Sequence, residues 1–167
     1  MQDKVRIFSM DLSLNLPGFA LLEIENNKVT VLNTGYVDNK KRTKDKHGRK
    51  INAIYRELCN MLSEADKVDY VVREKGFSRF AGVTQTLFKV VGISDLAVYQ
   101  YADMEVHEIT PTTVKKLVTG NGKAEKDEVA EAVERIIENK IEFYSDDVSD
   151  AVAVGIAFAV DKGILVI

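Results

Sequence analysis

Three apolar stretches of strand length occupy the first third of the chain, with polar turns between them. They run Val5–Ser13, Phe19–Ile24 and Val29–Tyr36, and runs of this length between turn residues are typical of strands. Asn26 and Asn27 separate the second stretch from the third, and asparagine tolerates the left-handed backbone angles of a tight hairpin. The pattern predicts an antiparallel meander of three strands.

The middle of the chain alternates between helical and strand-like spacing. Apolar residues recur every three or four positions between Ile51 and Ala65 and again over Thr84–Tyr101, so amphipathic helices are predicted over 49–65 and over the second range. The β-branched run Val68–Glu74 predicts a buried strand, and Glu105–Ile109 predicts another short strand.

Capping residues mark two further helices. Thr110 and Pro111 suit the cap and first turn of a helix that ends at the Gly-Asn-Gly of positions 120–122. The next helix is marked by apolar Val129, Val133, Ile136 and Ile137, with Glu125, Asp127 and Glu128 in its first turn.

The final apolar stretch is ambiguous by periodicity alone. Its large residues alternate with small ones, as in a strand: Val152, Val154, Ile156, Phe158 and Val160. The alanines between them and the Ser-Asp-Asp cap signal at 145–147 favour a buried helix instead.

The resulting order is β-β-β-α-β-α-β-α-α-α, which predicts an α/β fold. We expect a five-stranded mixed sheet, an antiparallel meander continued by parallel crossovers, flanked by helices. With 167 residues and no internal repeat, positions 1–167 are expected to form a single domain. In such a sheet the first strand is central and the fourth lies beside it.

Composition excludes several classes of protein. The chain is 46% hydrophobic and 29% charged, which is ordinary for a globular protein and excludes disorder, collagen and coiled coil. The longest apolar run, Ala151–Val160, is about half of what a membrane span needs. No secretory signal is recognised at the start. A lone Cys59 with widely separated His47 and His107 excludes a disulfide and a zinc site, so a cytoplasmic location is expected.

The net charge of −3 conceals a strong asymmetry. Residues 40–50 (KKRTKDKHGRK) contain seven Lys or Arg and one Asp, a local charge of +6, so the rest of the chain carries −9. Such a segment is either a solvated loop or a loop that binds a polyanion. The charge pattern alone leaves both open.

Four acidic residues stand where apolar residues are expected. Asp11 interrupts the first predicted strand near its end, and Glu74 ends the strand predicted at 68–74. Asp147 and Asp150 lie three positions apart, on one face of the start of the last helix. Each alone is better explained as a turn, edge or cap residue. Together they predict an oxygen-only site for Mg²⁺ or Mn²⁺, and two such ions about 4 Å apart suit phosphodiester cleavage.

The sequence resembles the RuvC-type Holliday junction resolvases of the ribonuclease H-like superfamily, most closely the variety encoded by lactococcal phages. The similarity runs from about Ile7 to Ala159 and is carried by FSMDLSLNLPGFAL, VVREKGFSRF, ITPTTVKKLVTGNGKAEKDEV and DDVSDAVAVGIA. It implies that the four acids bind two Mg²⁺ ions, replaceable by Mn²⁺, and that Phe77 contacts unpaired bases. Lys115 or Lys116, together with Lys126, falls on basic positions of the family's active-site region.

The resemblance implies a homodimeric endonuclease that resolves Holliday junctions and other branched DNA, leaving 5′-phosphate and 3′-hydroxyl ends. The alternatives are a branched-DNA-binding module that does not cut and a ribonuclease for RNA–DNA hybrid. The chain departs from the bacterial pattern at Leu12-Ser13 and Pro17, which weakens the expectation of sequence-selective cleavage and of a host branch-migration motor as partner. The residues expected to contact DNA are Lys40, Lys41, Arg42, Lys44, Lys46, Arg49, Lys50, Phe77, Arg79, Lys123 and Lys126.

Overall fold

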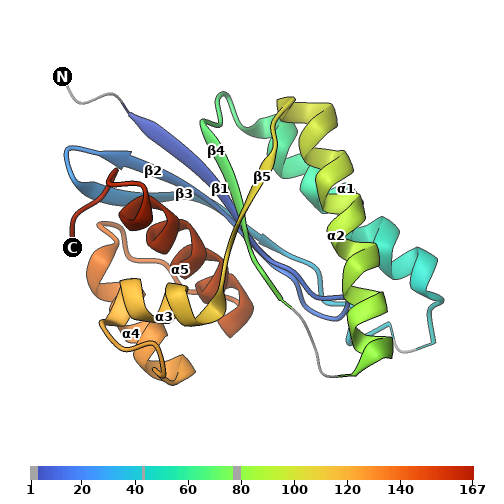
Figure 1. Cartoon of the computed structure of the whole chain (residues 1–167). Helices are drawn as coiled ribbons and strands as arrows, with labels where there is room; N and C mark the ends of the chain where they lie inside the picture. The colour runs from blue at the N-terminus through green and yellow to red at the C-terminus, as the bar shows by residue number, and fades with distance from the viewer. Residues whose placement is uncertain (1–3, 43, 77–79) are drawn as a thin grey trace.

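The computed structural model of the chain describes residues 4–42, 44–76 and 80–167. Five strands form one sheet in the order β3-β2-β1-β4-β5, with helices on both faces (Figure 1). The strands are β1 (Val5–Asp11), β2 (Gly18–Glu25), β3 (Lys28–Tyr36), β4 (Tyr70–Glu74) and β5 (Val106–Ile109). The helices are α1 (His47–Glu64), α2 (Ala81–Ala102), α3 (Pro111–Thr119), α4 (Lys126–Ile136) and α5 (Asp146–Asp161).

The topology confirms the predicted mixed sheet. β1, β2 and β3 pair antiparallel, while β4 pairs parallel with β1 and with β5. Asn26 and Asn27 have φ angles of 52° and 61°, the left-handed values that a two-residue hairpin turn requires. The central first strand and its neighbour β4 therefore end at the same edge of the sheet.

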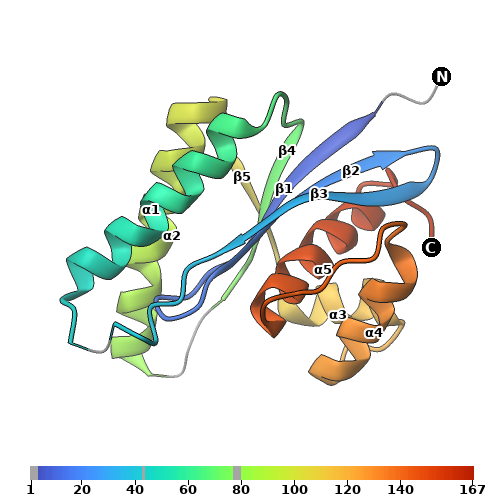
Figure 2. The same cartoon turned by 180° about the vertical axis from the view of Figure 1, so that it is seen from behind.

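The helices cover the two faces of the sheet in separate groups. Figures 1 and 2 show α1 and α2 on one face and α5, with α3 and α4, on the other. Side chains of β1 alternate between the two cores: Ile7 belongs to the core that contains α5, and Phe8 to the core under α1 and α2. Because side chains alternate along a strand, Asp11 faces α5.

The last apolar stretch is a helix, in agreement with the prediction from its alanines. Eleven of the sixteen residues of α5 are buried. Gly155 lets the helix lie against the central strands, since a Cβ there would stand 2.5 Å from Leu22 Cδ1 and 2.8 Å from Ser9 Oγ. No helix within the described ranges combines the length and apolarity needed to cross a bilayer.

Element boundaries differ from the predicted ones where side chains or single bridges end the regular structure. β1 ends at Asp11 and not at 13, where the Ser13 hydroxyl accepts a hydrogen bond from the Leu16 N–H and turns the chain. The prediction that Ile137 lies in the fourth helix is wrong, because this residue caps α4 and forms an isolated bridge with Val29. α1 begins at position 47 and not at 49, which moves two residues of the basic segment into a helix.

Candidate metal centre

Three of the four predicted acids meet where β1 ends and α5 begins. Asp11 is the last residue of β1, and Asp147 and Asp150 lie in the first turns of α5. Carboxylate oxygens of these three residues all lie within 4.8 Å of one another. The spacing of three positions on one helix face does bring both α5 acids to the end of the central strand.

Glu74 lies beside this cluster at the end of β4. It is not one of the three residues whose oxygens converge, but its charge reaches them. Burial, followed by the charges of Glu74, Asp150 and Asp147, raises the pKa of Asp11 well above its ordinary value. Burial and the charge of Asp150 raise the pKa of Glu74 to about 7. The four acids therefore form one electrostatic unit.

Crowded, partly buried carboxylates of this kind fit a divalent cation. Each raised pKa reports that the ionised form is disfavoured by burial and by neighbouring negative charge. A donor set made only of carboxylate oxygens matches a hard cation such as Mg²⁺ or Mn²⁺ rather than zinc.

Two lysines add positive charge to the acidic cluster. The Lys126 ammonium lies 3.4 Å from Asp150 Oδ2. Its positive charge offsets part of the rise in the pKa values of Asp11 and Glu74. Of the adjacent pair on α3, Lys115 is the one whose charge acts on Glu74. Lys116 instead lines a separate hollow between α3 and α4, and Lys123 lies exposed on the turn between those helices.

Gly18 explains how the start of α5 comes so close to the sheet. It pairs with Asp11 across β1 and β2, and a Cβ at this position would stand 2.2 Å from the Asp147 carbonyl oxygen. Since that neighbour is backbone, it cannot move aside without shifting the helix. The absence of a side chain at Gly18 therefore sets the distance between Asp11 and the α5 acids.

Replacing Gly18 with Ala is expected to destabilise the fold by about 3 kcal/mol, because the added methyl group overpacks the contact with α5. Urea denaturation should show the decrease in stability. The matched control is Gly48→Ala, where a Cβ meets nothing within 4 Å and a helical position gains the better helix former. Equal stability of the Gly18→Ala variant and the parent chain would contradict the close approach.

A tyrosine pair beside the site was not anticipated from the sequence. Tyr36, which pairs with Gly18 across β2 and β3, stacks on Tyr144 with ring centroids 3.6 Å apart and an interplanar angle of 8°. The Tyr144 hydroxyl donates a hydrogen bond to Asp38. The pair holds the segment before α5 to the end of β3. The sequence indicates the pair only indirectly: Tyr36 ends β3 and Tyr144 lies just before α5, and each is followed two residues later by an aspartate.

The basic segment starts at the edge of the sheet that carries the acids. It follows β3, whose last residue lies in register with Gly18 and so with Asp11. Aspartates compensate part of its charge: Asp38 pairs with Lys41, and Asp45 pairs with Arg42 and Arg49. Exposed lysines for which the described residues provide no ion pair are Lys40, Lys44 and Lys46.

Lys50 differs from the other predicted DNA contacts in this segment. It lies in the first turn of α1, within the helix predicted over 49–65, but only 9% of it is exposed. The expectation that it is an exposed DNA contact is therefore wrong for the free protein. Phe77 and Arg79 lie outside the described residues.

The raised pKa of Glu74 predicts how the stability of the metal-free protein depends on pH. The folded state holds this proton up to pH about 7, whereas the ordinary value is 4.5. The folded state thus binds more protons than the unfolded chain, so stability falls as pH rises through this interval, by about 3 kcal/mol for Glu74. Urea denaturation between pH 4.5 and 8 in EDTA measures the decline.

Two controls separate Glu74 from the other acids. Glu74→Gln is expected to remove its share of the decline, and Mg²⁺ added at pH 8 is expected to restore stability to the parent protein. A free energy of unfolding that stays constant or rises from pH 5 to 8 in EDTA would contradict the crowding of the carboxylates.

Together the sheet order and the position of the acids define a protein of the ribonuclease H-like superfamily. The family model described as crossover junction endodeoxyribonuclease RuvC matches residues 7–158, and the chain belongs to this family. RuvC of Ehrlichia ruminantium (strain Gardel) is 33% identical over 157 residues, which cover 91% of this chain and 94% of the relative.

Other relatives agree with this assignment. RuvC of Finegoldia magna is 27% identical over 152 residues, 91% of each chain. The structure of T. thermophilus RuvC in complex with Holliday junction substrate shares the fold, with a TM-score of 0.85 at 20% identity over 96% of each chain. The particular closeness to the lactococcal phage variety stays a prediction.

Proposed function

We propose that this chain is a metal-dependent endonuclease that binds four-way and other branched DNA and resolves it by hydrolysing two phosphodiester bonds. The observation that carries the proposal is the convergence of Asp11, Asp147 and Asp150, with Glu74 beside them, at one edge of the sheet. Membership of the RuvC family and the junction-bound relative support DNA junctions as substrate. Residues 1–167 act as a single nuclease domain in the cytoplasm.

The four acids are the proposed ligands of two Mg²⁺ ions. Asp11, which converges with Asp147 and Asp150 and is within reach of the charge of Glu74, would hold the ions together with these three acids. When bound, the ions supply an activated water and stabilise the leaving oxygen. Lys115 and Lys126 place positive charge beside the carboxylates, where it offsets the negative charge of the phosphate that is cut.

A comparison of substrates tests this function. End-labelled four-way junction, fork, linear duplex and RNA–DNA hybrid are each incubated with the protein in Mg²⁺, Mn²⁺ or EDTA. We expect metal-dependent nicks near the crossover, with 5′-phosphate and 3′-hydroxyl ends, and none in linear duplex. Binding without nicks would identify a non-cleaving module, and preferential cleavage of the hybrid would identify a ribonuclease; either result overturns the proposal.

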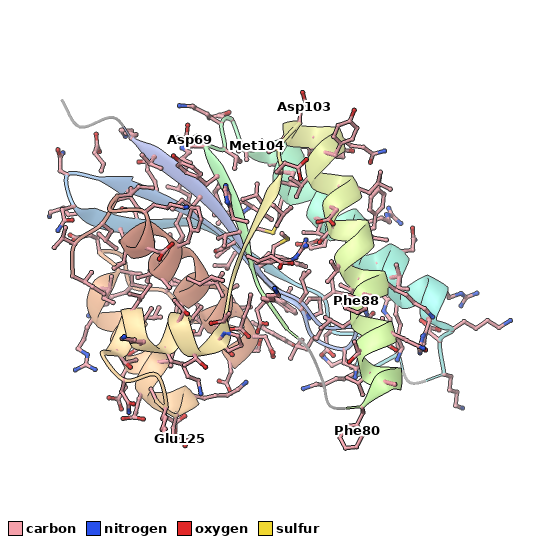
Figure 3. All side chains as sticks on the ribbon, in the orientation of Figure 1. Asp69, Phe80, Phe88, Asp103, Met104 and Glu125 are labelled. Carbon is pink, nitrogen blue, oxygen red and sulfur yellow. The ribbon has the colours of Figure 1, made fainter. Side chains whose placement is uncertain are left out.

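Resolution needs two symmetric cuts, and the described residues of one chain bring together one acidic cluster, so we propose a two-fold homodimer. The exposed side of α2 is the proposed interface. Phe88, Leu96 and Tyr99 are 60%, 48% and 66% exposed, and their spacing puts them on one stripe of the helix. Gly92 lies within that stripe and meets nothing within 4 Å, so a partner helix can approach closely there. Figure 3 labels Phe88 on α2, on the stretch of this helix that follows Phe80.

Replacing both Leu96 and Tyr99 with Asp is expected to give a monomer, because charged residues cannot be buried in an apolar contact without a large desolvation cost. The monomer should nick a supercoiled cruciform plasmid and fail to linearise it within one binding event. Sedimentation velocity checks the mass. The control is Leu32→Asp, an exposed apolar residue on β3. A double variant that remains dimeric would rule out this interface.

A further inference from the structure

A hollow of about 540 Å³ lies near the acidic cluster but on the other face of the sheet, the face covered by α1 and α2. It is formed by the loop after β1, by Gly76 just beyond β4 and by the first turns of α1 and α2. Leu12 directly follows Asp11, and Gly76 comes two residues after Glu74, so the hollow adjoins both acidic strands. Figures 1 and 2 show the first turns of α1 and α2 at the same end of the molecule. The proposed metal ligands are not part of it.

Lys50 makes this hollow chemically distinctive. Its side chain lines the hollow although only 9% of the residue is exposed. Within the described part of the chain, no carboxylate or hydrogen-bond acceptor pairs with its ammonium group. The stem of Lys50 is enclosed, while its Nζ is not among the buried side-chain atoms that lack a partner, so the ammonium stays accessible at the hollow. An accessible cation with no partner in the protein can attract an anion to the hollow.

The two helix ends add to the positive potential. The first turns of α1 and α2 line the hollow through His47, Lys50, Gly82 and Val83. Neither first turn contains an acidic residue, and the first turn of α1 carries basic residues at the positive end of its helix dipole. A bound anion would be stabilised by both dipoles.

The walls of the hollow are held in place by Asn39. Its side-chain amide donates hydrogen bonds to the carbonyl oxygens of Leu14 and Lys50, and its backbone N–H donates to Asn15. Asn39 is fully buried. It therefore ties the loop after β1 to the first turn of α1, so these two walls of the hollow are already fixed without a ligand.

We propose that this hollow binds one nucleotide, with the phosphate at Lys50 and the base on the apolar wall. That wall consists of Leu12, Leu14, Val83 and Leu87, beside polar Ser13 and Asn15. The volume falls within the range of about 300–1,000 Å³ that is usual for small-ligand pockets. An apolar surface next to a phosphate-binding cation is the chemistry with which proteins hold single unstacked nucleotides.

The nucleotide can be free or part of a DNA strand. The second source rests on the proposed function: a strand lying across the acids would bring an unpaired nucleotide of the crossover to the hollow next to Asp11. Such a contact would fix the strand on one side of the bond to be cut.

The test uses the metal-free protein, inorganic phosphate, thymidine and thymidine 5′-monophosphate as probes, with thermal shift and calorimetry as readouts. Thymidine 5′-monophosphate is expected to bind the parent chain at least tenfold more tightly than either of the other two. Lys50→Met should melt at or above the temperature of the parent chain and lose this binding, whereas Lys50→Arg and the exposed control Lys140→Met should keep it. Val83→Trp, at a half-exposed position, should lose the mononucleotide and keep phosphate.

Unchanged mononucleotide binding in Lys50→Met, or phosphate binding as tight as the mononucleotide, would overturn the proposal. For the DNA source, 2-aminopurine is placed at the crossover of a four-way junction in EDTA. The parent chain should increase its fluorescence several-fold, and Lys50→Met should not. An equal increase in both overturns that source. Because these measurements need no cleavage, their failure leaves the proposed nuclease function untouched.

Discussion

The Asp150→Asn variant is expected to cleave four-way junctions at least about 1,000-fold more slowly than the parent chain and to bind them as tightly or more tightly. Asparagine preserves the shape of the side chain and removes one negative charge from the group of oxygens within 4.8 Å. Loss of a hard ligand removes several kcal/mol of transition-state stabilisation, and each 1.4 kcal/mol is a factor of ten in rate. Single-turnover cleavage and gel-shift titration measure the two effects.

Asp146→Asn is the matched control for this prediction. Asp146 precedes Asp147 on the same helix turn and is exposed, and it is not among the three converging residues. The substitution makes the same change of charge near the site, so cleavage within a few-fold of the parent rate is expected. Cleavage by Asp150→Asn at a rate similar to that of Asp146→Asn would contradict a ligand role for Asp150.

Much of the fold could be predicted because local and long-range signals agree in this sequence. The asparagine turn gives the hairpin, Thr110 and Gly120 give the ends of α3, and strand order follows from connections that cross in one direction. The end of β1 could not be placed, because Leu12 and Leu14 continue an apolar pattern while the Ser13 hydrogen bond ends the strand. A single side-chain hydrogen bond of this kind does not change the pattern of apolar and polar residues in the sequence.

The acids were predictable because ionised side chains in apolar runs are costly and so need a reason. Which of Lys115 and Lys116 faces the site could not be predicted. Adjacent residues of a helix point in different directions, and the sequence does not say which one points to the acids. The need for glycine at position 18 could not be predicted either, because it comes from contact with the backbone of Asp147, which is distant in sequence. Burial of Lys50 was missed because the residues just before it, 46–49, are mostly basic and are exposed.

The basic segment carries the last prediction, which concerns affinity and not catalysis. Replacing Lys40, Lys44 and Lys46 together with Gln is expected to weaken junction binding on the order of 100-fold at about 50 mM salt. These three lysines are exposed, and unlike Lys41 and Arg42 they form no ion pair with an aspartate among the described residues, so their charge is free for phosphate. The slope of log affinity against log salt should decrease by about 0.9 for each phosphate that the variant no longer neutralises.

A triple variant with the same change of charge separates direct phosphate binding from net charge. Lys4, Lys28 and Lys67 are exposed and paired with acids of their own, near the opposite ends of β1, β3 and β4 from the acidic cluster. Their replacement with Gln should leave both the affinity and the salt slope nearly unchanged. Equal decreases in affinity in the two triple variants would mean that DNA responds only to net charge. A large decrease in affinity that is confined to the basic-segment variant would place the DNA backbone along the edge of the sheet where Asp11 ends β1. The strand bound by these lysines would then continue to the carboxylates.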